Sequence, residues 1–110
     1  MGEVHELFEH LDADPFCDRL LSAVDQAANQ FGGFTDGVTG DRGSGIRVVL
    51  RLPARHTEAR GNLTRIRPGL DPAALLALDG AISNLGGAVS SVDRKRLGQS
   101  YQITLAAEFR

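Results

Sequence analysis

The sequence predicts an α+β domain, and three observations lead to this fold class. A helix-forming segment, a Gly-Gly pair and two strand-like segments follow one another twice, in residues 14–53 and 71–110. Residues 101–109 alternate apolar and polar side chains, as a strand with one buried face does. Neither repeat can bury its apolar side chains alone, so we expect one four-stranded antiparallel sheet with two helices on one face. This arrangement is a ferredoxin-like two-layer sandwich made of two αββ repeats.

A shift of 54 positions superposes the second repeat on the first. The shift aligns the Gly-Gly pairs at 32–33 and 86–87 and several identical residues: Leu21 with Leu75, Ala23 with Ala77, Asp25 with Asp79, Ala27 with Ala81, Val38 with Val92 and Arg42 with Arg96. Residues 54–70 connect the repeats, and residues 1–13 precede them. We therefore expect a single domain over residues 14–110, preceded by the end of an amphipathic or coiled-coil helix.

The first repeat is expected to begin with a helix over residues 15–31. Asp14 is a typical N-cap residue, and Pro15 suits the first helical position. Apolar residues then recur at helical spacing until Gly32, a typical left-handed helix stop. The rest of the repeat is predicted to form a strand over residues 34–39, a turn over 40–45 and a half-buried strand over 46–52.

The connector and the second repeat follow the same rules. Asp71 and Pro72 begin the second helix, and Gly86 ends it. The polar residues 54–61 are expected to form an exposed loop, and residues 62–68 either a short extra strand or an extended connector. The remaining elements are a strand over residues 88–93, a charged turn over 94–100 and the final strand over 101–109.

The first residues of the chain form an apolar stripe at helical spacing, made of Val4, Leu7, Phe8 and Leu11. This segment is too short to be a stable helix by itself. It is therefore expected to pack on the domain or to continue a longer helix upstream.

Composition favours an ordinary globular domain. The 110 residues are 42% hydrophobic and carry a net charge of only −2, which does not by itself indicate nucleic-acid or membrane binding. The charges are unevenly distributed: residues 1–41 hold nine acidic side chains and one arginine, and residues 42–110 hold eleven basic and five acidic side chains. Such asymmetry suits head-to-tail contacts or a partner, or cancels within the folded monomer. No apolar run is long enough to span a membrane.

No residue pattern predicts catalysis, a metal site or a cofactor. Cys17, the only cysteine, is interpreted as a packing residue at the edge of the helix stripe. His5 and His10 are five residues apart, so they do not share a helix face as a metal-binding pair would. Residues 40–45 are rich in glycine but precede a strand, which favours a hairpin turn over a phosphate loop. Asp25 and Asp79 are expected on the outer helix surfaces.

Two binding functions remain as alternatives to a protein-interaction domain. A basic set on the predicted sheet could follow a nucleic-acid backbone, and it consists of Arg47, Arg51, Arg65 and Arg67. The predicted open face of the sheet has no aromatic side chains on which bases could stack, which makes nucleic acid the second choice. A small-ligand site between the helices is the least supported alternative.

The pattern resembles a known family of bacterial proteins. Residues 20–33 and 46–52, with residues 71–87, 89–96 and 101–109, are similar to the periplasmic domains of PilO-type and GspM-like proteins, which belong to the assembly platforms of type IV pili and type II secretion. The resemblance implies a non-enzymatic scaffold that forms homodimers and binds a related ferredoxin-like protein at the inner membrane. It also implies that residues 1–13 end a coiled coil that follows a membrane helix, and that the domain is periplasmic; otherwise we expect a cytoplasmic protein.

Candidate interaction residues follow from the stripe, the basic set and the resemblance. They are Val4, Leu7, Phe8, Leu11, Arg47, Arg51, Arg65 and Arg67. No catalytic, metal-binding or cofactor-binding residue is predicted.

Overall fold

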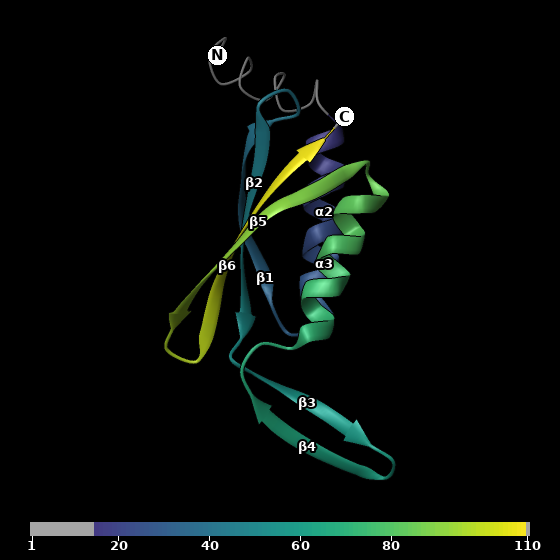
Figure 1. The fold of residues 1–110 in the computed structure, drawn as a ribbon, viewed down its shortest axis with the longest axis vertical. Coiled ribbons are helices and arrows are strands. Elements are labelled where there is room, and N and C mark those ends of the chain that lie inside the picture. Colours follow the sequence, from purple (N-terminus) through teal and green to yellow (C-terminus); the bar gives the residue numbers. More distant parts are fainter. Residues whose placement is uncertain (1–14, 110) are drawn as a thin grey trace, which may run out of the picture.

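The computed structural model describes residues 15–109, so the predictions about residues 1–14 lie outside it, including the stripe of Val4, Leu7, Phe8 and Leu11. The described chain forms two helices and six strands (Figure 1). In chain order these are α2 (Pro15–Asn29), β1 (Phe34–Asp41), β2 (Gly45–Pro53), β3 (Arg55–Arg60), β4 (Leu63–Pro68), α3 (Pro72–Asn84), β5 (Gly87–Leu97) and β6 (Ser100–Phe109).

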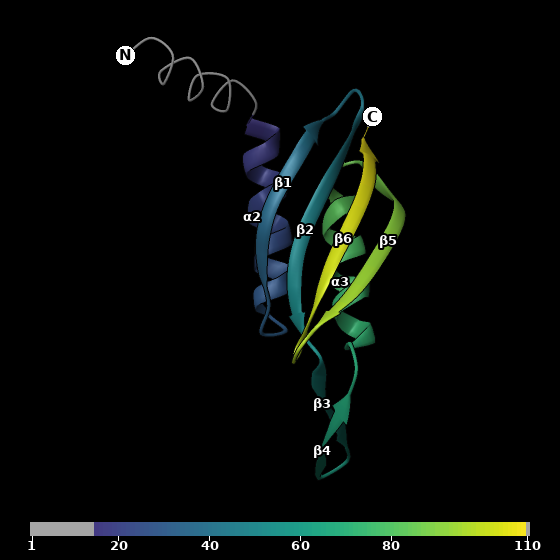
Figure 2. The same ribbon diagram turned by 90° about the vertical axis from the view of Figure 1, so that its left-hand side faces the viewer.

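Four strands form an antiparallel sheet in the order β1-β2-β6-β5. Both helices cover one face of this sheet, and the other face is open (Figures 1 and 2). The expected α+β class and four-stranded antiparallel sheet are therefore confirmed. The usual ferredoxin-like chain begins with a strand, so its strands are numbered in a different order across the sheet. This chain also has a second sheet, formed by β3 and β4. The ferredoxin-like assignment consequently remains a prediction.

The core lies between the helices and the two central strands. Leu50 on β2 is paired with Ile103 on β6, and both are completely buried. The helices contribute buried residues at positions related by the 54-residue shift: Leu20 and Ala74, Val24 and Leu78, Ala28 and Ile82. The predicted alternation of residues 101–109 is confirmed, because the side chains at 103, 105, 107 and 109 are buried. Burial of these side chains is the main driving force for folding of the body.

The two helices end in the predicted way. Gly32 has φ +79° and Gly86 has φ +86°, the left-handed conformation that favours glycine. After α2, the Gly33 N–H donates to the Ala28 carbonyl at 2.9 Å, which closes a Schellman-type helix end. At the start of α3, the Asp71 side chain accepts a hydrogen bond from the Ala73 N–H at 3.0 Å. The capping predictions at these three positions are confirmed.

Three boundary predictions were wrong. Residues 55–60 form strand β3 and are not a loop, because they pair with β4 across the two-residue turn at Gly61 and Asn62. Strand β5 continues to Leu97, because residues 94–97 pair with residues 100–103 of β6 and leave only Gly98 and Gln99 as the turn. The turn between β1 and β2 is confined to residues 42–44. The strand alternative for residues 62–68 is confirmed as β4.

Candidate interaction surfaces

Residues 55–68, which we call the arm, project from one end of the molecule as a two-stranded ribbon (Figures 1 and 2). In the described part of the chain, strands β3 and β4 pair only with each other, and every residue of β4 is exposed. An isolated two-stranded hairpin is at best marginally stable in water, because it has no core of its own. The arm therefore depends on something other than its own packing for a fixed structure.

The two faces of the arm differ in charge. Cross-strand partners share a face in an antiparallel ribbon. One face, which we call the basic face, carries His56, Glu58, Arg60, Leu63, Arg65 and Arg67. The other has a single charged residue, Arg55 at the base of the arm, followed by Thr57, Ala59, Thr64, Ile66 and Pro68, and we call it the neutral face. Each face exposes one large apolar side chain: Leu63 is 71% exposed and Ile66 is 70% exposed. The arm thus combines apolar contact area with four arginines and one glutamate, a net charge of +3.

Glu58 is the centre of a small ion network on the basic face. Its carboxylate lies 3.5 Å from Nε of Arg60 and 3.3 Å from Nε of Arg67. Because both arginines are exposed and Glu58 is only half-buried, the pairs contribute little stability. Within residues 15–109, Arg55 and Arg65 make no ion pair at all. The arm therefore retains positive charge for an external partner.

The arm is fixed to the body only at its base. The Gly69 N–H donates to the Ala54 carbonyl at 2.6 Å, and the Ala54 N–H donates to the Gln99 carbonyl at 2.9 Å in the β5–β6 turn. Nδ1 of His56 lies 3.2 Å from the Gly69 carbonyl oxygen. These bonds set the direction in which the arm leaves the body and leave its outer part free of the core.

A groove of about 480 Å³ follows the outer side of β1, where this edge strand meets the first half of α2. We call it the β1 groove. Its apolar lining includes Leu21, which is 41% exposed, and the half-buried Val38 and Cys17. Its acidic residues are Asp18, Asp36 and Asp41, and among residues 15–109 no basic residue lines it. Since β1 is an edge strand of the described sheet, its outward N–H and C=O groups have no strand partner within the same residues.

Asp41 ends β1 and organises the turn that follows it. Its Oδ1 accepts hydrogen bonds from the backbone N–H groups of Ser44 and Gly43, each at 2.8 Å. The backbone bond from Ser44, with further bonds from the Ser44 side chain and the Gly43 N–H, lowers the pKa of Asp41 below its ordinary value of 3.8. Asp41 therefore remains negatively charged at neutral pH and adds to the acidic character of the groove.

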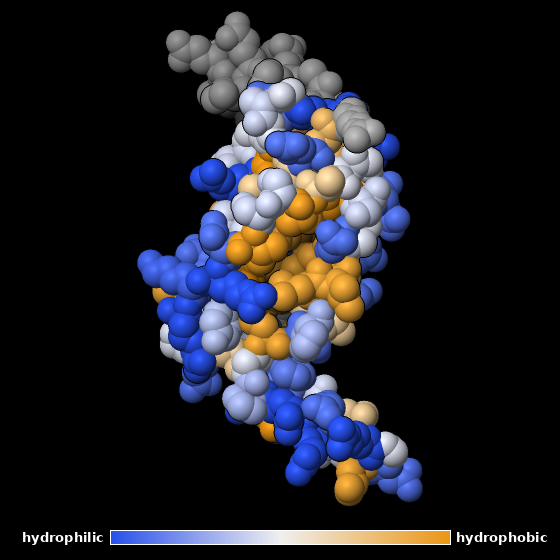
Figure 3. All heavy atoms as spheres, viewed as in Figure 1, coloured by the Kyte–Doolittle hydropathy of each residue, from blue (hydrophilic) through white to orange (hydrophobic). Residues whose placement is uncertain are grey.

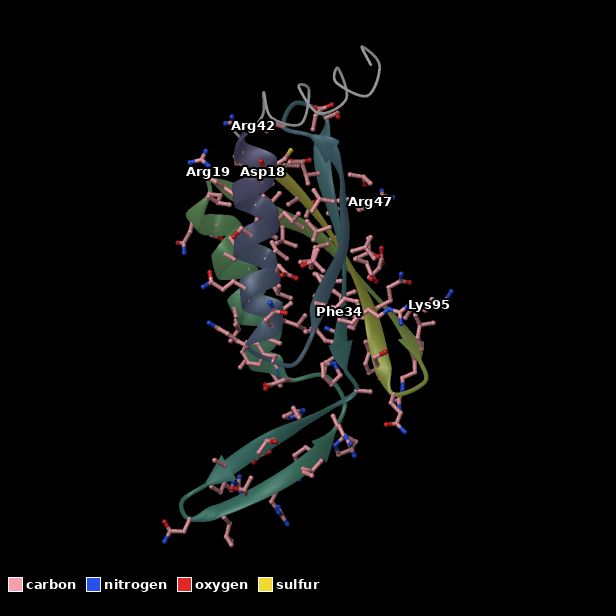
Figure 4. All side chains as sticks on the ribbon, turned by 180° about the vertical axis from the view of Figure 1, so that it is seen from behind. Asp18, Arg19, Phe34, Arg42, Arg47 and Lys95 are labelled. Carbon is pink, nitrogen blue, oxygen red and sulfur yellow. The ribbon has the colours of Figure 1, made fainter. Side chains whose placement is uncertain are left out.

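The open face of the sheet is polar and has few aromatic residues. The register aligns Arg47 with Ala106, Val49 with Thr104 and Arg51 with Gln102, so the predicted composition of this face is confirmed for β2 and β6. Arg47 and Lys95 project from this face, on the side away from the helices (Figure 4). Nε of Arg51 lies 3.4 Å from a carboxylate oxygen of Asp36 on the neighbouring strand, so part of the arginine's charge is compensated. Phe34, opposite Arg51, adds an exposed aromatic ring that the sequence analysis did not place there.

The structure separates the predicted basic set into two groups. Arg47 and Arg51 lie on the open face of the sheet, whereas Arg65 and Arg67 lie on the basic face of the arm. The two aspartates expected to be equivalent also differ. Asp25 is half-buried and accepts a hydrogen bond from the Thr35 N–H at 3.0 Å, which holds the start of β1, whereas Asp79 is exposed.

Other surfaces of the described chain offer less definite sites. Apolar atoms are visible between α3 and the sheet, and isolated apolar residues interrupt the hydrophilic surface of the arm (Figure 3). Open hollows lie at the base of the arm, between the arm and the β5–β6 turn, and between the helices. Among residues 15–109, no group of three or more side chains is arranged to hold a metal ion. No helix in this range is long and apolar enough to cross a membrane.

Sequence reasoning missed the residues that distinguish the arm and the groove. Leu63 and Ile66 were part of a connector, and Leu21 was regarded only as one position of the repeat. One signal was present: Gly61-Asn62 is a dipeptide typical of a two-residue hairpin turn, and it lies between two six-residue segments that could pair. Comparison with protein-family models, with curated proteins and with solved structures found no match to this chain.

Proposed function

We propose that this domain is a non-enzymatic structural domain that binds other proteins through its arm. The observation that carries this proposal is the exposure of Leu63 and Ile66 on a ribbon that pairs only with itself. Within residues 15–109, Leu63 and Ile66 contribute little to stability, because 71% and 70% of these residues remain exposed. A partner that covers them would add hydrophobic free energy.

The arm also has the form of a recognition element. Its two outer edges present backbone hydrogen-bonding groups, which allow an added strand to pair with it. Its arginines can pair with carboxylates and pack along apolar surface at the same time. Arginine is enriched in protein interfaces relative to the rest of the protein surface.

The proposal also includes the role in an assembly platform that the family resemblance implies. In this proposal the body is a ferredoxin-like sandwich that begins with a helix, and it forms homodimers and binds related ferredoxin-like proteins in a bacterial secretion or pilus assembly platform. Its support is the repeat pattern of the sequence and the arrangement of two helices on one face of a four-stranded sheet. Periplasmic localisation and a preceding membrane helix belong to the same proposal.

Removal of the arm tests the proposed function. Ala54 and Gly69 are hydrogen-bonded to each other, so a Gly-Gly turn can replace residues 55–68 without disturbing β2 or α3. We expect this variant to keep the melting temperature of the body and to lose both self-association in sedimentation velocity and binding to partners identified by cross-linking in cells. Lys95→Gln, on the open face of β5, is the control. Unchanged protein binding after arm removal would contradict the proposal.

Nucleic acid is a second candidate because of one observation, the net charge of +3 on an exposed two-stranded ribbon. The DNA major groove admits such a ribbon, and arginines on it can contact phosphates and bases. Titration with a fluorescent duplex at low and moderate salt tests this candidate. Binding that weakens steeply with salt and disappears without the arm would favour nucleic acid over protein as the partner.

A further inference from the structure

We propose that the arm of one copy of this chain docks in the β1 groove of a second copy and extends its sheet. This inference rests on the proposed function and specifies its partner and its binding site. The partner's arm would pair with the free edge of β1 through main-chain hydrogen bonds, as in other cases of strand addition.

The two faces of the arm match the two sides of the groove. On the helix side, the groove presents Leu21, Cys17 and Val38, and the neutral face of the arm presents Ile66, Thr64 and Ala59. On the open-face side, β1 carries Asp41 at its end and Asp36, whose carboxylate also pairs with Arg51, and the basic face of the arm carries Arg60, Arg65 and Arg67. A strand added to β1 therefore places apolar side chains against apolar side chains and arginines near aspartates.

The opposite edge of the sheet does not offer the same match. The last part of β5, the opposite edge strand, carries Arg94, Lys95 and Arg96 in succession. Like charges would repel the basic arm from this edge, so the charge pattern selects β1 over β5. Charged residues on an edge strand are also a common means of preventing unwanted strand pairing.

The position of the groove excludes the arm of the same molecule. Asp18 lies at the end of α2 that is farthest from the arm (Figures 1 and 4), and the molecule is elongated, with extents of 57 × 29 × 23 Å. Two copies that lie side by side in opposite directions can each place an arm in the other's groove. Such a pair is closed and symmetric, and it covers both arms and both β1 edges at once.

Mixed disulfide cross-linking tests the contact directly, because Cys17 lines the groove. One chain is the wild type, and the other carries Cys17→Ser with either Thr64→Cys or Thr57→Cys on the neutral face of the arm. We expect a disulfide-linked heterodimer after mild oxidation of the mixture. The matched control is Cys17→Ser with Leu63→Cys, which moves the thiol by one residue to the basic face and should cross-link much less.

Sedimentation velocity over a wide concentration range gives the second readout. We expect a reversible dimer whose dissociation constant increases with salt concentration. Arg65→Gln removes one charge from the arm and should raise this constant roughly two- to fivefold, the effect of one exposed charge pair. Lys95→Gln, which removes a charge from the open face of β5, should leave the dimer unchanged. Heteronuclear NMR spectra of the variants show whether the body keeps its fold.

Each other outcome overturns the inference. A chain that stays monomeric but still binds a different protein through its arm removes the second copy as partner and, with it, the proposed homodimer, while protein binding through the arm stands. Equal cross-linking from Leu63→Cys and Thr64→Cys would show that docking is not specific to one face of the arm. A monomer whose arm binds duplex DNA, and no protein, contradicts both the inference and the proposed function.

Discussion

At the scale of single residues, Asp41 shows how one side chain can set a turn. It accepts backbone hydrogen bonds from Ser44 and Gly43 while it remains exposed to solvent. We expect Asp41→Ala to lower the melting temperature at neutral pH and Asp41→Asn to lower it less, because asparagine keeps an oxygen acceptor.

The pH dependence of this effect has a defined sign. The pKa of Asp41 is lower in the folded chain than its ordinary value of 3.8, so its stabilisation is complete above that pH. It is lost as the pH falls through the folded-state pKa. Thermal unfolding at neutral and acidic pH should therefore show the difference between wild type and Asp41→Ala becoming smaller in acid. A constant difference at both pH values would mean that the carboxylate charge is not involved.

Asp25 and Asp79 show which properties the sequence repeat does not predict. Asp25 and Asp79 occupy equivalent positions in the sequence, yet only Asp25 holds the start of a strand through the Thr35 N–H. Equivalence in a repeat predicts backbone position and burial, as for Val24 and Leu78. It does not predict side-chain hydrogen bonds, because these depend on neighbours that the two copies do not share.

At the scale of elements, the helix ends are the most predictable feature. We expect Gly86→Val to reduce the free energy of unfolding by about 1–2 kcal/mol, since a β-branched residue resists positive φ. A Cβ added at Gly86 meets no atom within 4 Å, so the loss would come from backbone strain alone. Gly32→Val should have a similar effect at the end of α2.

Gly80→Ala is the matched control in the middle of α3. A Cβ at this position also meets no atom within 4 Å, and φ is not positive. We therefore expect a gain of about 0.5–1 kcal/mol, because alanine loses less backbone entropy in a helix. Urea denaturation measures both variants, and a Gly86→Val protein as stable as the wild type would show that the left-handed helix end is not required.

The predictability of the other elements depended on where their side chains point. Residues 46–52 and 101–109 were predictable because one face enters the core, which produces an alternating pattern. The arm was only half recognised, because neither face of β3 enters the core and its polar residues read as a loop. The extension of β5 was missed for a similar reason, since residues 94–96 are charged and their strand pairing leaves no apolar signal.

At the scale of the whole molecule, a well-packed body carries an arm that its own core does not support. The sequence predicted the body and its uneven charge, and it placed four arginines in one candidate set. It could not show that Arg65 and Arg67 lie on a projecting ribbon, because that separation depends on the antiparallel pairing of the connector with itself. The acidic groove was likewise hidden, since it joins residues of α2 and β1 that are about 20 positions apart in sequence.

The central claim is that the arm becomes ordered by binding to another protein chain, and amide hydrogen exchange tests it most directly. Exchange is measured at residues 57–59 and 64–66 in dilute and in concentrated protein, with Ile103 and Leu105 of the buried sheet as internal references. We predict rapid exchange in the arm when the protein is dilute and strong protection once it associates, while the reference amides stay protected throughout. Arm amides that exchange at the same rate in the dilute and the associated protein would contradict this account.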